Sequence, residues 1–190
     1  MKYYILFGPP GAGKGTQAKL ISKEFNLLHV STGELLRKEI AEGTELGIMA
    51  QQIISEGHLV PDDIVVGMIE HIFSTTEGVN GFLLDGFPRT INQAKMLDKM
   101  LKEDEHAKVD KVISLIISDA TIFERIGKRA EVEGREDDAA SAIIKNRIDT
   151  YHTQTEPLIE YYKEQGKYYP IEGERSIEEV FESACALIKE

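Results

Sequence analysis

The sequence predicts an α/β protein built on a five-stranded parallel sheet with helices on both faces. Short apolar runs of strand length alternate along the 190-residue chain with segments of helical periodicity, which is typical of parallel strands joined through helices. The runs are almost continuously apolar, as at residues 112–117, and strands of that kind are covered on both faces. The length suits one domain with a substantial core.

Residue patterns place the elements in chain order. Strands are expected at residues 2–7, 28–31, 81–85, 111–117 and 168–172. Between the second and third strands, Ser31 and Glu34 have the spacing of a helix N-terminus, and Gly43 divides two short helices. Three later helices are indicated by apolar stripes, the last of which is expected to lie in the core: Ile122, Phe123 and Ile126; Ile144, Ile148 and Tyr151; and Ile177, Val180, Phe181, Ala184 and Leu187.

A glycine-rich segment from Gly8 to Thr16 joins the first strand to the first helix. Four glycines and Lys14 occupy nine residues, and the spacing from Gly8 through Gly13 to Lys14 is that of a phosphate-binding loop. The residue after the lysine is Gly15, where a hydroxyl residue is usual, and the hydroxyl follows at Thr16. A plain turn is the weaker interpretation, so the segment indicates nucleotide phosphate and a fold of the P-loop NTPase type.

A second chemical segment ends the third strand. Asp85 closes an apolar run, and a carboxylate beside a phosphate loop can hold Mg²⁺ or its water shell. Gly86 and Pro88 shape a turn that directs Arg89 across the same edge, and Gln93 follows one turn later, where its amide could read a base edge. A turn carrying a surface arginine is the alternative interpretation.

A third segment places Arg125 and Arg129 four residues apart on one helix. Like charges at that spacing repel unless an anion lies between them. An acidic, glycine-containing run at 131–138 follows, and Arg147 lies on the next helix. An exposed charged loop is the alternative, but the arginines that bracket the run favour a phosphate-binding role.

Composition narrows the possible classes. A formal net charge of −11 disfavours nucleic acid as a partner, so a site for anions must be built locally from the seven arginines. The single cysteine, Cys185, excludes a disulfide framework and a cysteine-based zinc site. The absence of an apolar run of membrane length and of a signal peptide predicts a soluble, cytoplasmic protein.

Taken together, the motifs resemble the adenylate kinase family from one end of the chain to the other. The resemblance rests on ordered segments at residues 8–17, 31–37, 57–62, 85–93 and 125–147. It implies Mg²⁺-dependent, reversible transfer of the γ-phosphoryl group of ATP to AMP, giving two ADP and serving purine nucleotide and energy balance. It also implies a core at 1–30, 61–127 and 139–190, a monophosphate-binding arm at 31–60, and a short lid at 128–138.

The resemblance further assigns residues to each substrate. It places ATP on Gly11, Ala12, Gly13, Lys14, Gly15, Thr16, Arg125, Arg129 and the backbone near Arg175. It places AMP on Thr32, Arg37, His58, Leu59, Val60, Gly86, Phe87, Pro88, Arg89, Gln93, Arg135 and Arg147. The transferred group is expected among Lys14, Arg89, Arg125, Arg135 and Arg147, with Mg²⁺ held through water by Asp85.

Some choices stay open at the level of sequence. Thr32 and Gln93 favour AMP, because relatives acting on pyrimidines tend to carry alanine and asparagine there. A pyrimidine or broad monophosphate kinase and a non-enzymatic adenine-nucleotide sensor remain as alternatives. The lid departs from the family pattern at Ala130, Glu133 and Ala139, and its short form suggests a monomer.

Overall fold

The computed structural model describes residues 1–103, 106–133 and 141–190, without the side chains of residues 130–133 and 141. Its five strands are β1 (Lys2–Phe7), β2 (Leu27–Ser31), β3 (Gly81–Asp85), β4 (Lys111–Ile116) and β5 (Tyr168–Glu172). They form one parallel sheet in the order β2-β3-β1-β4-β5. The predicted sheet is therefore confirmed, with strand boundaries within one residue of expectation.

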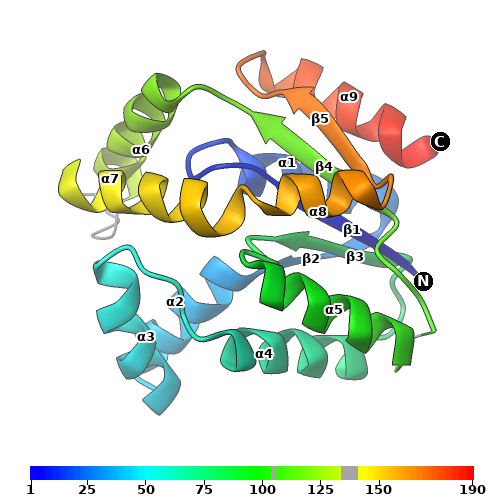
Figure 1. Cartoon of the computed structure of the whole chain (residues 1–190), viewed down its shortest axis with the longest axis horizontal. Coiled ribbons are helices and arrows are strands. Elements are labelled where there is room, and N and C mark those ends of the chain that lie inside the picture. The colour runs from blue at the N-terminus through cyan, green and yellow to red at the C-terminus, as the bar shows by residue number, and fades with distance from the viewer. Residues whose placement is uncertain (104–105, 134–140) are drawn as a thin grey trace.

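Helices connect the strands and cover both faces of the sheet (Figure 1). They are α1 (Lys14–Phe25), α2 (Thr32–Glu42), α3 (Glu45–Ser55), α4 (Asp62–Thr75), α5 (Ile91–Glu103), α6 (Asp119–Glu133), α7 (Ser141–Thr150), α8 (Leu158–Glu164) and α9 (Ile177–Lys189), with a π-helical turn η2 (Tyr151–Thr155) between α7 and α8. None of the helices within the described ranges is both long and apolar enough to cross a membrane.

Alternating residues of β1 divide the core into two layers. Tyr3, Ile5 and Phe7 pack with the apolar faces of α4, α5 and α8, whereas Tyr4 and Leu6 pack with α1 and α9. A central parallel strand buried on both sides explains why the run at 3–7 is continuously apolar.

One expected core residue lies outside the core. Ile177 is 57% exposed, whereas Val180 and Ala184 further along α9 are buried. Ile177 is the first residue of the helix, directly after the N-cap Ser176, and the buried stripe begins only at Val180. Phe123 on α6 is also 42% exposed, because its neighbours Ile122 and Ile126 supply the buried stripe.

Strand register brings the chemical segments to one edge. Leu6 of β1 pairs with Asp85 of β3, and Ser31 of β2 pairs with the same Asp85, so three strands end at one level. Figure 1 shows α2 and α3 projecting on one side of this edge and α6 and α7 on the other. In open parallel sheets, ligands bind beyond the carboxyl ends of the strands.

Two helical glycines give a matched test of the packing. A Cβ on Gly47 would lie 2.1 Å from the Glu39 backbone oxygen, whereas a Cβ on Gly67 of α4 would meet nothing within 4 Å. Gly47→Ala is therefore expected to lower the free energy of unfolding by about 1–3 kcal/mol through the forced separation of α2 and α3. Gly67→Ala is expected to raise it by about 0.5–1 kcal/mol, because alanine favours a helix. Urea unfolding of both variants tests this; equal effects would contradict the close α2–α3 contact.

Candidate active site

A large cavity lies at the carboxyl edge of the sheet. Its volume is about 1090 Å³, and it is lined by the loop before α1, by α2, by the segment at 57–60, by the turn after β3, and by α6 and α7. The cavity exceeds the size usual for one small ligand, so it has room for two nucleotides.

The glycine-rich loop takes a backbone path that requires glycine. Gly8 has a φ of 142°, and a Cβ there would lie 2.7 Å from the backbone oxygen of Leu115 in β4. Gly13, with a φ of 88°, is the left-handed N-cap of α1. The loop can therefore lie close against the sheet, and the N-terminus of α1 lines the cavity. The first N–H groups of a helix have no partner within the helix, so this end favours an anion.

Lys14 begins α1 and is partly exposed to the cavity. Its Nζ donates hydrogen bonds to the backbone oxygens of Gly8 and Pro9, both at 2.8 Å. Burial lowers the pKa of Lys14 from 10.5 to about 8, although the nearby Asp85 carboxylate partly opposes this shift. A phosphate could take over the two carbonyl contacts and stabilise the charged ammonium.

Asp85 is buried at the end of β3, and His29 Nε2 lies 3.3 Å from its Oδ2. Burial by itself would raise the pKa of Asp85, but the His29 hydrogen bond and the charges of Lys14 and Arg89 outweigh it and lower the pKa. The carboxylate is thus ionised at neutral pH, where it can accept hydrogen bonds from metal-bound water.

Five arginines line the cavity from separate elements: Arg37 of α2, Arg89 after β3, Arg125 and Arg129 of α6, and Arg147 of α7. Arg89 Nε donates to the Gly86 backbone oxygen at 2.8 Å, and an Arg125 NH₂ group donates to the Gly173 backbone oxygen at 3.1 Å. Such bonds orient planar guanidinium groups, which bind phosphate in a bidentate manner.

Neutral polar groups also line the cavity. Thr32 and Gln93 are buried and line it together with the segment from His58 to Val60. Thr32 Oγ1 donates to the Gly86 backbone oxygen at 2.8 Å, which ties α2 to the turn after β3. A hydroxyl and an amide set among apolar groups suit a base and a sugar better than a phosphate.

The structure brings together most of the site predicted from the sequence. The predicted residues that line the cavity are Gly11, Gly13, Lys14, Gly15, Thr16, Thr32, Arg37, His58, Leu59, Val60, Asp85, Gly86, Phe87, Pro88, Arg89, Gln93, Arg125, Arg129 and Arg147. Ala12 is buried inside the loop. The Arg175 side chain is bonded to its own loop and to Ser183 of α9, outside this lining. Arg135 and Ala139 lie outside the described residues, as do the side chains of Ala130 and Glu133.

Other lining residues were not predicted from the sequence. Lys128 lies on α6 between the two predicted arginines, and Tyr151 and Thr155 come from the π-helical turn η2. Thr155 Oγ1 donates to the Arg89 backbone oxygen at 2.7 Å. A π-helical turn has no periodic signature in the sequence, although such turns are frequent at functional sites.

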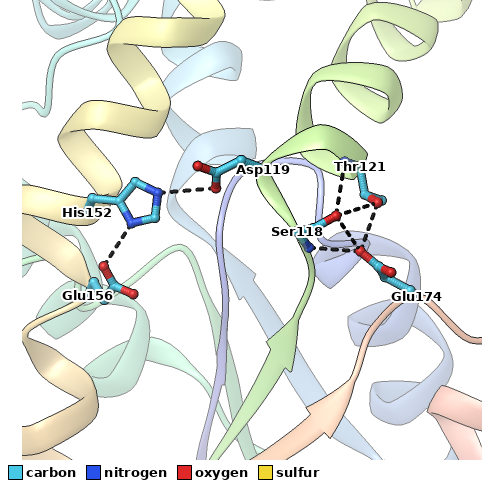
Figure 2. A network of polar contacts seen from close by, with 6 residues as sticks. All are labelled: Ser118, Asp119, Thr121, His152, Glu156 and Glu174. Carbon is cyan, nitrogen blue, oxygen red and sulfur yellow. Dashed lines mark hydrogen bonds and ion pairs between the residues drawn. The ribbon is translucent and has the colours of Figure 1, made fainter.

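Two polar clusters hold the base of α6 (Figure 2). Glu174 Oε1 accepts hydrogen bonds from the Ser118 backbone N–H, the Ser118 hydroxyl and Thr121, each at 2.8 Å, and these bonds lower the pKa of Glu174 to about 2. On the other side, His152 lies between Glu156, at 2.8 Å, and Asp119, at 3.2 Å. His152 thereby joins η2, which follows α7, to the first residue of α6.

The His152 bridge gives an expected pH dependence. The hydrogen bond to Glu156 raises the pKa of His152 above 6.5, against a smaller opposing effect of burial, and the bond to Asp119 adds to the rise. Because the charged form is favoured in the folded state, the bridge stabilises the protein below about pH 6.5, and this contribution is lost as the pH rises through the folded pKa. His152→Gln should cost less than about 1 kcal/mol near pH 6, because the site is partly solvated, and less still near pH 9.

Urea unfolding of the wild type and the variant at both pH values measures that difference. The exposed His71 of α4 provides the control, since His71→Gln removes a histidine away from Asp119 and Glu156. A cost for His152→Gln that grows with pH would contradict the charged bridge.

Known proteins resemble this chain over most of its length. The family model described as adenylate kinase matches residues 6–167. Proteins named adenylate kinase from Parabacteroides distasonis and Leptospira biflexa are 45% and 46% identical over 177 and 180 residues, which cover 93% and 95% of this chain and 92% and 96% of theirs. One from Corynebacterium urealyticum is 46% identical over 186 residues, covering 97% of this chain and 98% of its own.

The match extends through the glycine-rich loop, the turn after β3 and the arginine-bearing helices, and it continues well beyond any single motif. A parallel α/β sheet, a glycine-rich loop before α1 and a large cavity lined by arginines are thus found in one chain with relatives over nearly its whole length. The chain belongs to the adenylate kinase family.

Proposed function

We propose that the protein catalyses the reversible transfer of the γ-phosphoryl group of ATP to AMP, giving two ADP. The observation that carries this proposal is the convergence of Lys14, Asp85, five arginines, Thr32 and Gln93 in one cavity of about 1090 Å³. A site of that charge and size accommodates a polyphosphate and a second nucleotide. The family match and the relatives named adenylate kinase support the same activity.

The two substrates are assigned to different walls of the cavity. ATP phosphates would lie on residues 11–16, which lead into the N-terminus of α1, and on Arg125 and Arg129 of α6. The AMP phosphate would lie near Arg37, Arg89 and Arg147, and its base near Thr32 and Gln93. Arg135 is assigned to the transferred group by sequence resemblance, and the backbone near Arg175 to the ATP base.

Mg²⁺ would enter this site with ATP. Among the described residues, no group of three or more histidine, cysteine, aspartate or glutamate side chains is placed to hold a metal ion. An ion that enters with ATP would take ligands from phosphates and water. Asp85 fits that requirement, because its lowered pKa keeps it ionised beside Lys14. Bound Mg²⁺ would neutralise charge on the phosphates as the bond to the leaving oxygen breaks.

The chain contributes position and charge to the reaction. An oxygen of the AMP phosphate attacks the γ-phosphorus of ATP, and the bond from that phosphorus to the β–γ bridging oxygen breaks, so ADP leaves and a second ADP forms. Lys14, Arg89 and Arg125 stabilise the charge on the group in transit, and their fixed directions reduce the reorganisation required. No side chain has to act as a nucleophile.

Closure of two segments would complete the site. The arm at 31–60 carries α2 and α3, and the lid at 128–138 includes the last turn of α6, from which Lys128 and Arg129 line the cavity together with residues of α2. Their closure would exclude water, which otherwise competes with AMP for the γ-phosphoryl group. A monomer in the cytoplasm is the matching expectation from the sequence.

The test is ADP formation from ATP and Mg²⁺ with AMP, GMP, CMP or UMP as acceptor. Turnover with AMP is expected to be faster than with every other acceptor, and at least about a hundred times faster than with GMP or UMP, because a site built to pair with a base edge rejects a base that lacks the matching groups. Faster turnover with CMP or UMP would give the protein a different acceptor class. Tight nucleotide binding without turnover would instead identify an adenine-nucleotide sensor.

A further inference from the structure

Asp62, the first residue of α4, gathers three side chains from the start of α5. Its Oδ1 accepts from Gln93 Nε2 at 2.8 Å, and its Oδ2 accepts from Asn92 Nδ2 at 2.7 Å. The Thr90 hydroxyl lies 3.2 and 3.3 Å from the two carboxylate oxygens and also accepts from the Gln93 backbone N–H at 3.1 Å. The carboxylate therefore fixes α4 to α5 directly behind Gln93, which lines the cavity.

These contacts give the Gln93 amide one orientation. Its Oε1 accepts from the Arg89 backbone N–H at 2.7 Å, while its Nε2 donates to Asp62. A backbone N–H can only donate, and an ionised carboxylate can only accept. Rotating the amide by half a turn would place nitrogen against the N–H and oxygen against the carboxylate, and Gln93 is only 2% exposed, so water cannot relieve the two repulsive contacts.

The same contacts fix the direction of the remaining donor and acceptor positions of the Gln93 amide. Among the described residues, the second Nε2 hydrogen and the second Oε1 lone pair have no hydrogen-bond partner. Gln93 lines the cavity, whereas Asp62 does not, so Asp62 can influence a ligand only through its neighbours. A ligand at this wall would meet one donor beside one acceptor, in a fixed order.

Nucleotide bases differ in whether their edges complement the fixed donor and acceptor of Gln93. A six-amino purine presents the N6 amino donor beside the N1 acceptor, which complements the oxygen and nitrogen of an amide. A six-oxo purine presents the O6 acceptor beside the N1–H donor. The fixed amide would place its oxygen against O6 and its N–H against N1–H, and both contacts are repulsive. Uracil has the pattern of the six-oxo purine, and cytosine that of adenine.

We propose that Asp62 is a positioning residue that holds the Gln93 amide in the orientation for a six-amino purine, and that the monophosphate site thereby rejects six-oxo purines. The inference rests on the proposed function, in which Gln93 faces the base of the acceptor nucleotide. The proposal adds Asp62, a residue outside the cavity, to those that determine which nucleotide accepts the phosphoryl group.

The wild-type protein provides a first test without any substitution. Three acceptors of nearly equal size are compared by kcat/KM: AMP, inosine monophosphate and purine riboside monophosphate, which has no substituent at position six. A fixed amide predicts the order AMP, then purine riboside monophosphate, then inosine monophosphate, because only the last brings two repulsive contacts. An amide free to turn would bond both edges of inosine monophosphate, so inosine monophosphate ahead of purine riboside monophosphate would overturn the proposal.

The second test uses a matched pair of variants in the first turn of α4. Asp62→Asn and Asp63→Asn remove the same charge from neighbouring positions, and Asp63 is exposed. An asparagine at 62 can offer either oxygen or nitrogen to Gln93, which leaves only the Arg89 N–H to fix the amide. The ratio of kcat/KM for AMP over inosine monophosphate should fall about tenfold in Asp62→Asn, within the range that a paired amide contact to a base edge provides.

Further readouts separate positioning from general damage. KM for AMP should rise in Asp62→Asn while KM for ATP stays unchanged, and Asp63→Asn should keep the wild-type ratio. A ratio in Asp62→Asn equal to that in Asp63→Asn would refute the role of Asp62. Absence of turnover with AMP in the wild type would refute the proposed function itself, so the two failures are distinct.

Discussion

Replacing Lys14 with methionine is expected to lower kcat by about three orders of magnitude while leaving the fold intact. Methionine has similar length but no charge, so it cannot stabilise the phosphoryl group in transit. Lys14 Nζ bonds only to the backbone oxygens of Gly8 and Pro9 among the contacts the structure shows, so its loss removes little from the fold. Steady-state ADP formation and thermal unfolding measure the two effects.

Lys23→Met is the control, since Lys23 lies in the last turn of the same helix and away from the cavity. It should keep wild-type turnover. Near-normal kcat in Lys14→Met would contradict the proposed role of this lysine.

The lowered pKa of Lys14 adds a second signature. In the free protein the pKa is about 8, so the ammonium loses its proton as the pH rises through that value. Bound phosphates favour the charged form, and KM for ATP is therefore expected to rise above about pH 8 in the wild type. Lys14→Met should lack this rise.

Replacing Asp85 with asparagine is expected to lower kcat by about two orders of magnitude. The buried carboxylate is proposed to hold the water shell of Mg²⁺, and an amide is a weaker ligand without charge. The substitution would also remove the negative charge that opposes the lowering of the Lys14 pKa. Activity measured over a wide range of Mg²⁺ concentrations should show a higher requirement for the ion.

Asp110→Asn provides the matched loss of charge at the opposite end of the sheet. Asp110 accepts hydrogen bonds from Lys2 Nζ and the Tyr3 backbone N–H, so its substitution should lower stability without changing kcat or the Mg²⁺ requirement. If Asp85→Asn responded to Mg²⁺ as the wild type does, Asp85 would have no part in holding the ion.

The sequence predicts the sheet and the phosphate loop well, because both have local signatures. Continuous apolar runs mark the five strands, and the glycine spacing around Lys14 marks the loop. Helical patterns were less complete: Ile177 fits the stripe of α9 but lies in its exposed first turn. Periodicity identifies a face of a helix, while the extent of that face that meets the sheet depends on packing.

Contacts between distant segments could not be predicted in the same way. Asp62 and Gln93 are 31 residues apart, and neither the distance nor the direction of their hydrogen bond leaves a pattern in the sequence. His29 reaches Asp85 only because β2 and β3 are neighbours in parallel register, and strand order was not expected from the sequence. The residues that carry charge were predicted, but those that orient them were not.

The chain is acidic overall but its cavity is lined by arginines, and this contrast makes binding depend on the length of the anion. With a formal net charge of −11, the surface repels a polyanion that stays outside the mouth, and screening limits that repulsion to about 8 Å at physiological ionic strength. Inside the mouth the arginines dominate. A mononucleotide is short enough to cross from one region to the other, whereas a polymer keeps most of its phosphates outside. The distribution of charge therefore favours short anions over long ones, independently of the base that they carry.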